Sequence, residues 1–447
     1  MVELAGGTRS GPSFRVVLAL SAAALACKLV VFLFSIRTSM SISLPSAENW
    51  QDFNLAYVPA AKAFRNGFVP YRDFYYPYPP LFLYALTIPS FLPLPSWSSA
   101  LPLVVADALT VIPVYLIARE LVGERFSTAI AAAFVLAPTS LYYADYLWLN
   151  PSLTTLFLMV SVYFLIKGRY DLSAVSLAVS IGFKQTALLA LPVMMLIVWR
   201  ARGRGTAAVR FFAIAAAICA VVSIPFIFYS PSNYLGSVFS VPSSLWSGVS
   251  LPANYWSLAV GTGTPVSFNT LNWLTSKWQA LAGAINAPVS LGLPVFIFLL
   301  PASLTWVYGS YYSGILLVAL FGVYLVLLFR IGRNRRVQAV DTVRYTLYAL
   351  LLLLVLYPVY KYYVVGVIPI FALLMRSKKD MLGFEALNLC LMFVPRYFAS
   401  WALLVSLLWL LRRPMARSLS SLGSLLPRLR GVASPQRRRT HSPRGFS

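Results

Sequence analysis

The chain has 447 residues, of which 59% are hydrophobic and 11% are charged, with a mean hydropathy of +0.76. It carries 36 Lys and Arg against 12 Asp and Glu, a formal net charge of +24. These values exclude an ordinary soluble globular protein and indicate a polytopic membrane protein. Apolar runs of roughly 20 residues, the length that crosses a bilayer, follow one another continuously. The sequence therefore predicts an all-α, transmembrane helical bundle of about ten to twelve spans.

The basic residues gather between the apolar runs, at 200–210, 330–336, 376–379 and from 412 to the last residue. This is the arrangement that the positive-inside rule requires of cytoplasmic loops, so the charge indicates contact with membrane lipids and not with nucleic acid. We expect residues 1–411 to form the bundle. Residues 412–447 are rich in Ser, Arg and Pro, which predicts a basic, disordered cytoplasmic tail.

The first apolar run, 14–36, follows basic residues but is too long for a secretory signal, so it predicts an uncleaved span with a cytoplasmic N-terminus. Residues 37–97 then form a first external loop. Within it, 54–66 has helical spacing, and 81–91 is apolar but short and bounded by prolines. Both segments predict helices that lie along or dip into the membrane surface.

The rest of the bundle follows from the apolar runs in chain order. The segment 172–199 is too short for two full spans and carries Phe183-Lys184-Gln185 at its middle, which predicts two half-length helices that meet partway. The segment 288–307 is ambiguous, and the charge rule favours a partly re-entrant structure. The remaining predicted spans are 98–121, 128–142, 152–166, 211–229, 315–329, 345–357, 364–375 and a last pair within 381–411.

Few residues in this chain are able to perform acid–base chemistry. The only histidine is His441, in the tail, so neither imidazole catalysis nor a His-ligated metal is available in the bundle. Acid–base work falls to carboxylates, with Tyr or Lys as weaker candidates. Asp107 lies within a span, where pairing with Lys or Arg of a neighbouring helix is the favoured interpretation. The predicted topology leaves four carboxylates outside: Glu48, Asp52, Asp73 and Asp145.

Three cations are placed where they could meet an anionic lipid headgroup. Lys184 lies at the junction of two short helices beside Gln185, and Lys361 and Arg396 head predicted external turns. Interfacial snorkelling of these long side chains is the alternative interpretation.

The order of motifs resembles that of a known family. The first loop reads DF(x)3Y(x)2AA(x)5G(x)2PY and continues into a Tyr-rich YPPL. Asp145 is followed by LWLNPSL, and FKQTALLALP and YKYYVVGVIP come later. Together these segments, dispersed over roughly residues 15–375, resemble polytopic GT-C glycosyltransferases that use polyprenyl-phosphate sugars, and in particular their mannosyltransferase-like prokaryotic members.

The resemblance implies an inverting transfer in which a first-loop carboxylate deprotonates the acceptor hydroxyl, and Asp52 matches that position. The alternative is that Asp52 caps the helix beginning at Phe53. Asp73 could bind sugar or simply pair with Arg72. Asp145 could orient the acceptor, or hold a divalent cation such as Mg²⁺ or Mn²⁺ with Asp52. No metal requirement is implied, because the first loop lacks the DxD or adjacent acidic pair of metal-dependent members.

The remaining candidate site residues surround these carboxylates. Tyr71 and Tyr76 could stack on sugar, although tyrosines also form aromatic belts at membrane interfaces. Lys184, Lys361 and Arg396 are candidates for the donor phosphate, and Gln185 lies beside Lys184.

We therefore expect a multi-pass cell-membrane enzyme that transfers a hexose such as mannose from a polyprenyl-phosphate sugar to a lipid-linked or glycan acceptor. Two alternatives remain: a transporter or flippase of lipid-linked sugar, and a non-catalytic subunit of a glycosylation complex. A transporter predicts two related halves, and no internal repeat is visible in the sequence.

Overall fold

The computed structural model describes residues 14–42, 52–74, 76–231, 234–235, 238, 250–251, 268–269, 321–334, 337–356 and 361–393. The predicted tail at 412–447, the predicted segment 288–307 and Arg396 lie outside these ranges.

The structure is helical, which confirms the all-α prediction. In the first half of the chain the elements are α1 (Phe14–Thr38), η1 (Phe53–Tyr57), α2 (Val58–Arg65), α3 (Pro80–Thr87), η2 (Ile88–Phe91), η3 (Ser96–Ala100), α4 (Leu101–Leu109), α5 (Val111–Val122), α6 (Glu124–Val135), α7 (Pro138–Ser140), η4 (Leu141–Tyr146), α8 (Ser152–Ile166), α9 (Tyr170–Phe183), η5 (Gln185–Leu189), α10 (Ala190–Arg202) and α11 (Gly205–Tyr229).

The later elements are the paired two-residue strands β1 (Ser250–Leu251) and β2 (Phe268–Asn269), followed by α16 (Ala339–Leu356), η8 (Lys361–Gly366), α17 (Ile368–Ala372) and α18 (Lys378–Phe393). Residues 321–333 are also helical. The segments η1 and η4 are π-helical, and the other η segments are 3-10 helices.

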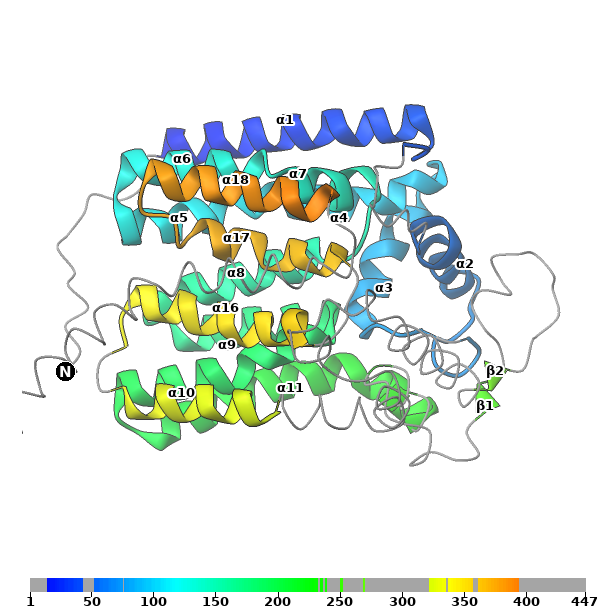
Figure 1. The fold of residues 1–447 in the computed structure, drawn as a ribbon. Helices are drawn as coiled ribbons and strands as arrows, with labels where there is room; N and C mark the ends of the chain where they lie inside the picture. Colours follow the sequence, from blue (N-terminus) through cyan, green and yellow to red (C-terminus); the bar gives the residue numbers. More distant parts are fainter. Residues whose placement is uncertain are drawn as a thin grey trace, which may run out of the picture. The chain divides into compact units, whose positions relative to one another are not determined.

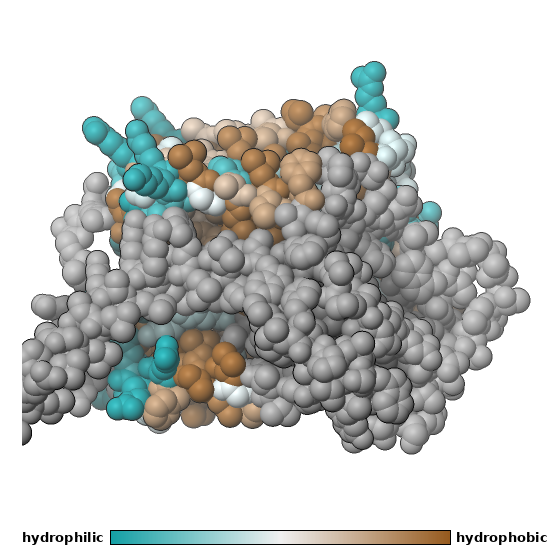
Figure 2. All heavy atoms as spheres, viewed as in Figure 1, coloured by the Kyte–Doolittle hydropathy of each residue, from teal (hydrophilic) through white to brown (hydrophobic). Residues whose placement is uncertain are grey.

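Five helical runs in the described ranges are long and apolar enough to cross a membrane: Phe14–Thr38, Ser96–Val122, Glu124–Tyr146, Gln185–Arg202 and Gly205–Tyr229. The bundle helices lie side by side in Figure 1. Apolar side chains such as Phe14, Val30 and Leu33 of α1 are exposed, as expected of a surface that faces lipid. Over the coloured upper part of Figure 2, hydrophobic residues occupy the middle and hydrophilic residues lie toward the ends.

The predicted break at Lys184 is confirmed, but only the first of the two helices is short, because the run Gln185–Arg202 is long enough to cross a membrane. Helix α9 ends at Phe183, Lys184 adopts an extended backbone conformation, and the chain restarts as η5 and α10. The two predicted loop helices are also present, as η1 with α2 and as α3 with η2. In Figure 1, α2 and α3 lie at one end of the bundle helices and run across them.

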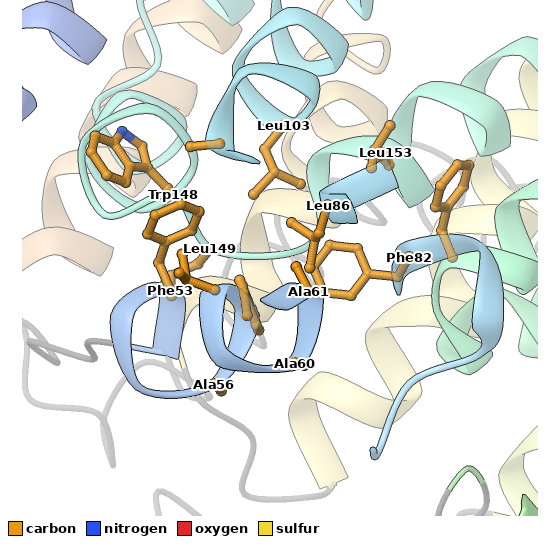
Figure 3. Close-up of a cluster of buried hydrophobic side chains, with 14 of the residues drawn as sticks. Phe53, Ala56, Ala60, Ala61, Phe82, Leu86, Leu103, Trp148, Leu149 and Leu153 are labelled. Atoms are coloured by element: carbon orange, nitrogen blue, oxygen red, sulfur yellow. The ribbon is translucent and has the colours of Figure 1, made fainter. Parts of the chain in front are cut away.

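A shared apolar cluster joins these loop helices to the bundle (Figure 3). Phe53 of η1 packs edge-on against Trp148 with ring centroids 4.8 Å apart, and Tyr57 packs likewise against Phe82 of α3 at 4.9 Å. Gly182 of α9 allows close approach, because a Cβ there would lie 2.6 Å from Cδ1 of Leu81. These contacts hold the first loop against the end of α9, where Lys184 lies.

A buried ion cluster fastens α1 to two other elements. The Lys28 ammonium lies 2.6 Å from Oδ2 of Asp107 in α4 and 2.9 Å from Oδ2 of Asp145 in η4, and all three side chains are buried. The Ser140 hydroxyl donates to Oδ2 of Asp107 at 2.8 Å. The favoured interpretation of Asp107, a partner of a cation on a neighbouring helix, is therefore correct.

The predicted end of the span 128–142 is wrong, because Asp145 lies within the helical run and not in a turn beyond it. The helical run continues through Asp145 to Tyr146, and the Asp145 side chain is fully buried against Lys28. The physical reason is Lys28 itself. A cation near the middle of a membrane span is too far from either surface to snorkel, so it draws carboxylates into the interior.

Replacing Lys28 by Met leaves two buried carboxylates without their shared cation. We expect the free energy of unfolding to fall by about 3–5 kcal/mol, as when one partner of a buried ion pair is removed. Thermal or denaturant unfolding in detergent measures the change. Arg210→Ala is the control, because it breaks an exposed ion pair with Asp171 and should have little effect. Equal shifts for the two variants would contradict this role of Lys28.

Candidate active site

Lys184 is the most unusual side chain at the end of the bundle that carries the loop helices. It is 2% exposed, and its ammonium donates a hydrogen bond to the backbone carbonyl of Asn150 at 2.9 Å. Three aromatic rings surround it: the centroids of Tyr363, Tyr362 and Tyr78 lie 3.7, 5.0 and 5.9 Å from Nζ. Among the described residues it has no salt bridge, so its charge is compensated by a carbonyl dipole, by π-faces and by the more remote charge of Asp52.

A crevice borders Lys184 between α8, η5, α16 and η8. Its polar lining includes Lys184, Thr154 and Tyr363, and the apolar side chains Leu158, Ala187, Leu350 and Val367 line the rest. The crevice has a volume of about 40 Å³ and places a cation beside aliphatic side chains.

Asp52 does not line this crevice, but it is close enough for its charge to act on Lys184. It occupies the N-cap position of η1 and is half-buried, but its side chain makes no capping hydrogen bond to that helix. The capping interpretation is therefore not supported. The negative charge of Asp52 acts on Tyr57, Tyr78, Tyr362 and Lys184, so these groups share one electrostatic environment.

The tyrosines beside Asp52 are donors and not bases. Burial, followed by neighbouring groups including Asp52, raises the pKa of Tyr57 and of Tyr78 well above the usual value. Both hydroxyls therefore stay protonated at neutral pH. Two groups in this region have the chemistry of a general base: the Asp52 carboxylate, and Lys184, because burial lowers the pKa of Lys184 to about 7.

Asp73 pairs with Arg72, which is one of its two predicted roles. The guanidinium Nε and Nη2 donate to Oδ1 and Oδ2 of Asp73, both at 2.7 Å, and the Val69 N–H donates to Oδ2 at 2.6 Å. The Arg72 hydrogen bond and charge, with the Val69 N–H, hold the pKa of Asp73 below its usual value. This carboxylate closes the 69–73 turn.

Tyr71 and Tyr76 belong to the core of the loop and not to an exposed belt. Tyr71 is fully buried, with φ of +66°, and its hydroxyl donates to the carbonyl of Tyr78. Its ring packs edge-on against Tyr234 and Phe226, which joins the first loop to α11. Tyr76 is 2% exposed and packs against the Tyr71 ring. Packing is the role that this arrangement supports for both.

Gln185 is fully described by the structure, and Lys361 is described by its backbone only. The Gln185 amide nitrogen donates to the carbonyls of Pro77 at 3.2 Å and Val238 at 2.7 Å, so it tethers the first loop beside Lys184. The backbone of Lys361 begins η8, which also carries Tyr362 and Tyr363. Its side chain and all of Arg396 lie outside the described residues.

Asp52 and Asp145 do not fit the divalent-cation site that the sequence allows for them. The Asp145 carboxylate is engaged by Lys28, whose positive charge would repel a metal ion. In the described ranges, no group of three or more His, Cys, Asp or Glu side chains could hold a metal.

Sequence reasoning missed Lys28 and Asn150. Lys28 could have been found as a lone cation in the middle of a 25-residue apolar helix. Asn150 lies in the LWLNPSL segment. Its position near Lys184 depends on the backbone turn in this segment and could not be read from a sequence motif. Trp148, with φ of +54°, turns the chain after η4 and brings Asn150 between Tyr57 and Lys184.

Comparison with known families supports the predicted class. Residues 127–244, about a quarter of the chain, match the family model described as ALG3 protein. That family comprises dolichyl-phosphate-mannose-dependent mannosyltransferases of the GT-C type, so the predicted resemblance is confirmed over this segment. The match supports a glycosyltransferase of the GT-C type. The matched segment contains Asp145, Asn150 and Lys184, but not Asp52. No curated protein matches this chain in sequence.

Among solved structures, the chain is similar to the oligosaccharyltransferase of Archaeoglobus fulgidus. The apo form is 12% identical over 89% of this chain and 57% of that chain, with a TM-score of 0.42. The complex with Zn and sulfate is 13% identical over 87% and 53%, with a TM-score of 0.41. The same organism's AglB with an inhibitory peptide and a dolichol-phosphate is 13% identical over 86% and 56%, at 0.37. This chain thus spans a little over half the length of these structures.

Asp73→Asn should weaken the 69–73 turn by removing the charge that Arg72 and the Val69 N–H stabilise. We expect a lower unfolding temperature, by a few degrees at most because the ion pair is partly exposed. Since the pKa of Asp73 is depressed in the folded state, the difference from wild type should be present at neutral pH. It should shrink as the pH falls below the usual carboxyl pKa of about 4. A difference that persists unchanged at low pH would contradict the ion-pair role.

Proposed function

We propose that this protein is a membrane glycosyltransferase that transfers a hexose such as mannose from a polyprenyl-phosphate sugar to a lipid-linked or glycan acceptor. In this proposal the reaction inverts the anomeric centre and takes place on the extracytoplasmic face. The match of residues 127–244 to a family of dolichyl-phosphate-mannose-dependent enzymes supports the class of reaction and of donor.

The single observation that carries the proposal is the Lys184 ammonium, which is buried beside an otherwise aliphatic crevice. Within the described ranges it has hydrogen-bonding and aromatic contacts but no carboxylate at ion-pair distance. A buried cation of this kind is electrostatically incomplete, and a phosphate would complete it. A polyprenyl phosphate has an anionic head to match this cation and an apolar chain to match the aliphatic side chains beside it.

The proposed reaction is a single displacement. The Asp52 carboxylate accepts the proton of the acceptor hydroxyl as its oxygen bonds to the anomeric carbon. The bond between that carbon and the phosphate oxygen breaks, and polyprenyl phosphate leaves with the bonding electron pair. Lys184 stabilises the charge that develops on the departing phosphate. The Tyr57 and Tyr78 hydroxyls share one hydrogen bond at 3.4 Å, which leaves one of their two protons to donate to the same groups.

Asp52→Asn tests the catalytic assignment, because the amide keeps the shape of the side chain and loses its basicity. We expect the transfer rate to fall by roughly 10²–10⁴-fold, the usual contribution of a general base, while the unfolding temperature stays near wild type. The assay uses purified protein in liposomes with radiolabelled polyprenyl-phosphate hexoses and a range of acceptors.

Asp171→Asn is the matched control, since Asp171 is an exposed carboxylate paired with Arg210. It should retain wild-type transfer. If Asp52→Asn transfers sugar as fast as this control, Asp52 is not the base. A wild-type protein that moves lipid-linked sugar across the membrane without transferring it would favour the transporter alternative.

A further inference from the structure

Buried polar atoms without hydrogen-bond partners are concentrated around the start of α8. Six of the fifteen such atoms in the described residues lie there or beside Lys184: the Trp148 Nε1, both amide atoms of Asn150, the Ser152 Oγ, the Thr154 Oγ1 and the Gln185 Oε1. A buried donor or acceptor left unpaired destabilises the fold by roughly 1–3 kcal/mol, so such a group needs a reason.

Asn150 is the clearest of these cases. The residue is 0% exposed, and neither its side-chain nitrogen nor its side-chain oxygen has a partner among the described residues. By contrast, both backbone polar groups of Asn150 form hydrogen bonds within the candidate site. The N–H donates to the Tyr57 hydroxyl at 3.4 Å, and the carbonyl accepts from the Lys184 ammonium at 2.9 Å.

The chemistry of the unpaired atoms indicates what would pair with them. A carboxamide presents two N–H donors and one carbonyl acceptor. A phosphate or phosphate diester offers acceptors only, so it would leave the Asn150 oxygen unpaired. A sugar hydroxyl both donates and accepts, so one or two neighbouring hydroxyls can satisfy both ends of the amide. Lys184, with donors only, is the complementary match for the phosphate.

We propose that the Asn150 carboxamide binds hydroxyl groups of the donor sugar while Lys184 binds the phosphate that carries it. This assignment rests on the proposed function, and it divides donor recognition between two neighbouring residues. It makes Asn150 a residue that distinguishes the sugar-bearing lipid from the bare lipid phosphate. Lys184, in contrast, recognises both.

The test measures binding to two lipids in nanodiscs: a polyprenyl phosphate and polyprenyl phosphohexoses that carry mannose, glucose or galactose. For Asn150→Leu, which is close in size and apolar, we expect affinity for the best phosphohexose to fall about tenfold, corresponding to about 1.4 kcal/mol. Affinity for the bare phosphate should stay within a factor of about two of wild type. Lys184→Met should weaken binding of both lipids.

Asn388→Leu is the matched control. Asn388 is also fully buried, and its side-chain oxygen likewise has no partner among the described residues, but its amide nitrogen donates to the Phe384 carbonyl within α18, and it makes no contact with Lys184. Neither affinity should change in this variant. Because Asn150→Leu removes a buried group that has no partner, it should not lower the unfolding temperature; if it does, Asn150→Ala provides the same comparison of the two lipids.

Three results would overturn the assignment, and they have different meanings. If the Asn150 variant binds both lipids as wild type does, or loses affinity for both equally, the sugar role of Asn150 is wrong while the proposed function stands. If the wild-type protein binds neither lipid, the assignment falls together with the proposed function.

Discussion

The Lys28 ammonium holds three parts of the bundle together, because it pairs at once with Asp107 of α4 and Asp145 of η4. A cation in the middle of a membrane span cannot remain unpaired, so the positions of these helices are set by one electrostatic requirement. The next contacts along α1 reinforce it: Thr38 shares a hydrogen bond with the Tyr146 hydroxyl at 2.9 Å. With η4 fixed in this way, the turn through Trp148 brings Asn150 to the end of the bundle, between Tyr57 and Lys184.

The two buried lysines, Lys28 and Lys184, differ in how their charges are compensated. Lys28 is paired with two carboxylates, those of Asp107 and Asp145, and is enclosed by protein. Lys184 receives aromatic rings, a carbonyl and the more remote charge of Asp52, and it borders a crevice. Complete pairing suits a structural cation, whereas incomplete pairing is typical of a cation whose partner is a ligand. This contrast, more than any motif, separates the structural charge cluster from the candidate active site.

Much of the fold could be predicted from apolar run lengths, including the break at Lys184 and the two loop helices. The break was visible because a polar Lys-Gln pair divides an apolar segment too short for two spans. Burial of particular polar residues was harder to predict. Asp145 appeared exposed because its neighbours resemble a turn, and only the position of Lys28 in the folded bundle explains its burial. The roles of Tyr71 and Asn150 depend on left-handed backbone conformations, at Tyr71 itself and at Trp148, which local sequence does not specify.

The most direct test of this account is a structure of the protein in lipid nanodiscs with a bound polyprenyl-phosphate sugar. The account predicts the phosphate within ion-pair distance of the Lys184 ammonium, with the isoprenoid chain along Leu158, Ala187, Leu350 and Val367 and the sugar toward Asn150 and Asp52. A phosphate bound instead among Arg169, Arg202 and Arg204, which line a separate hollow at the opposite ends of α9 and α10, would contradict it.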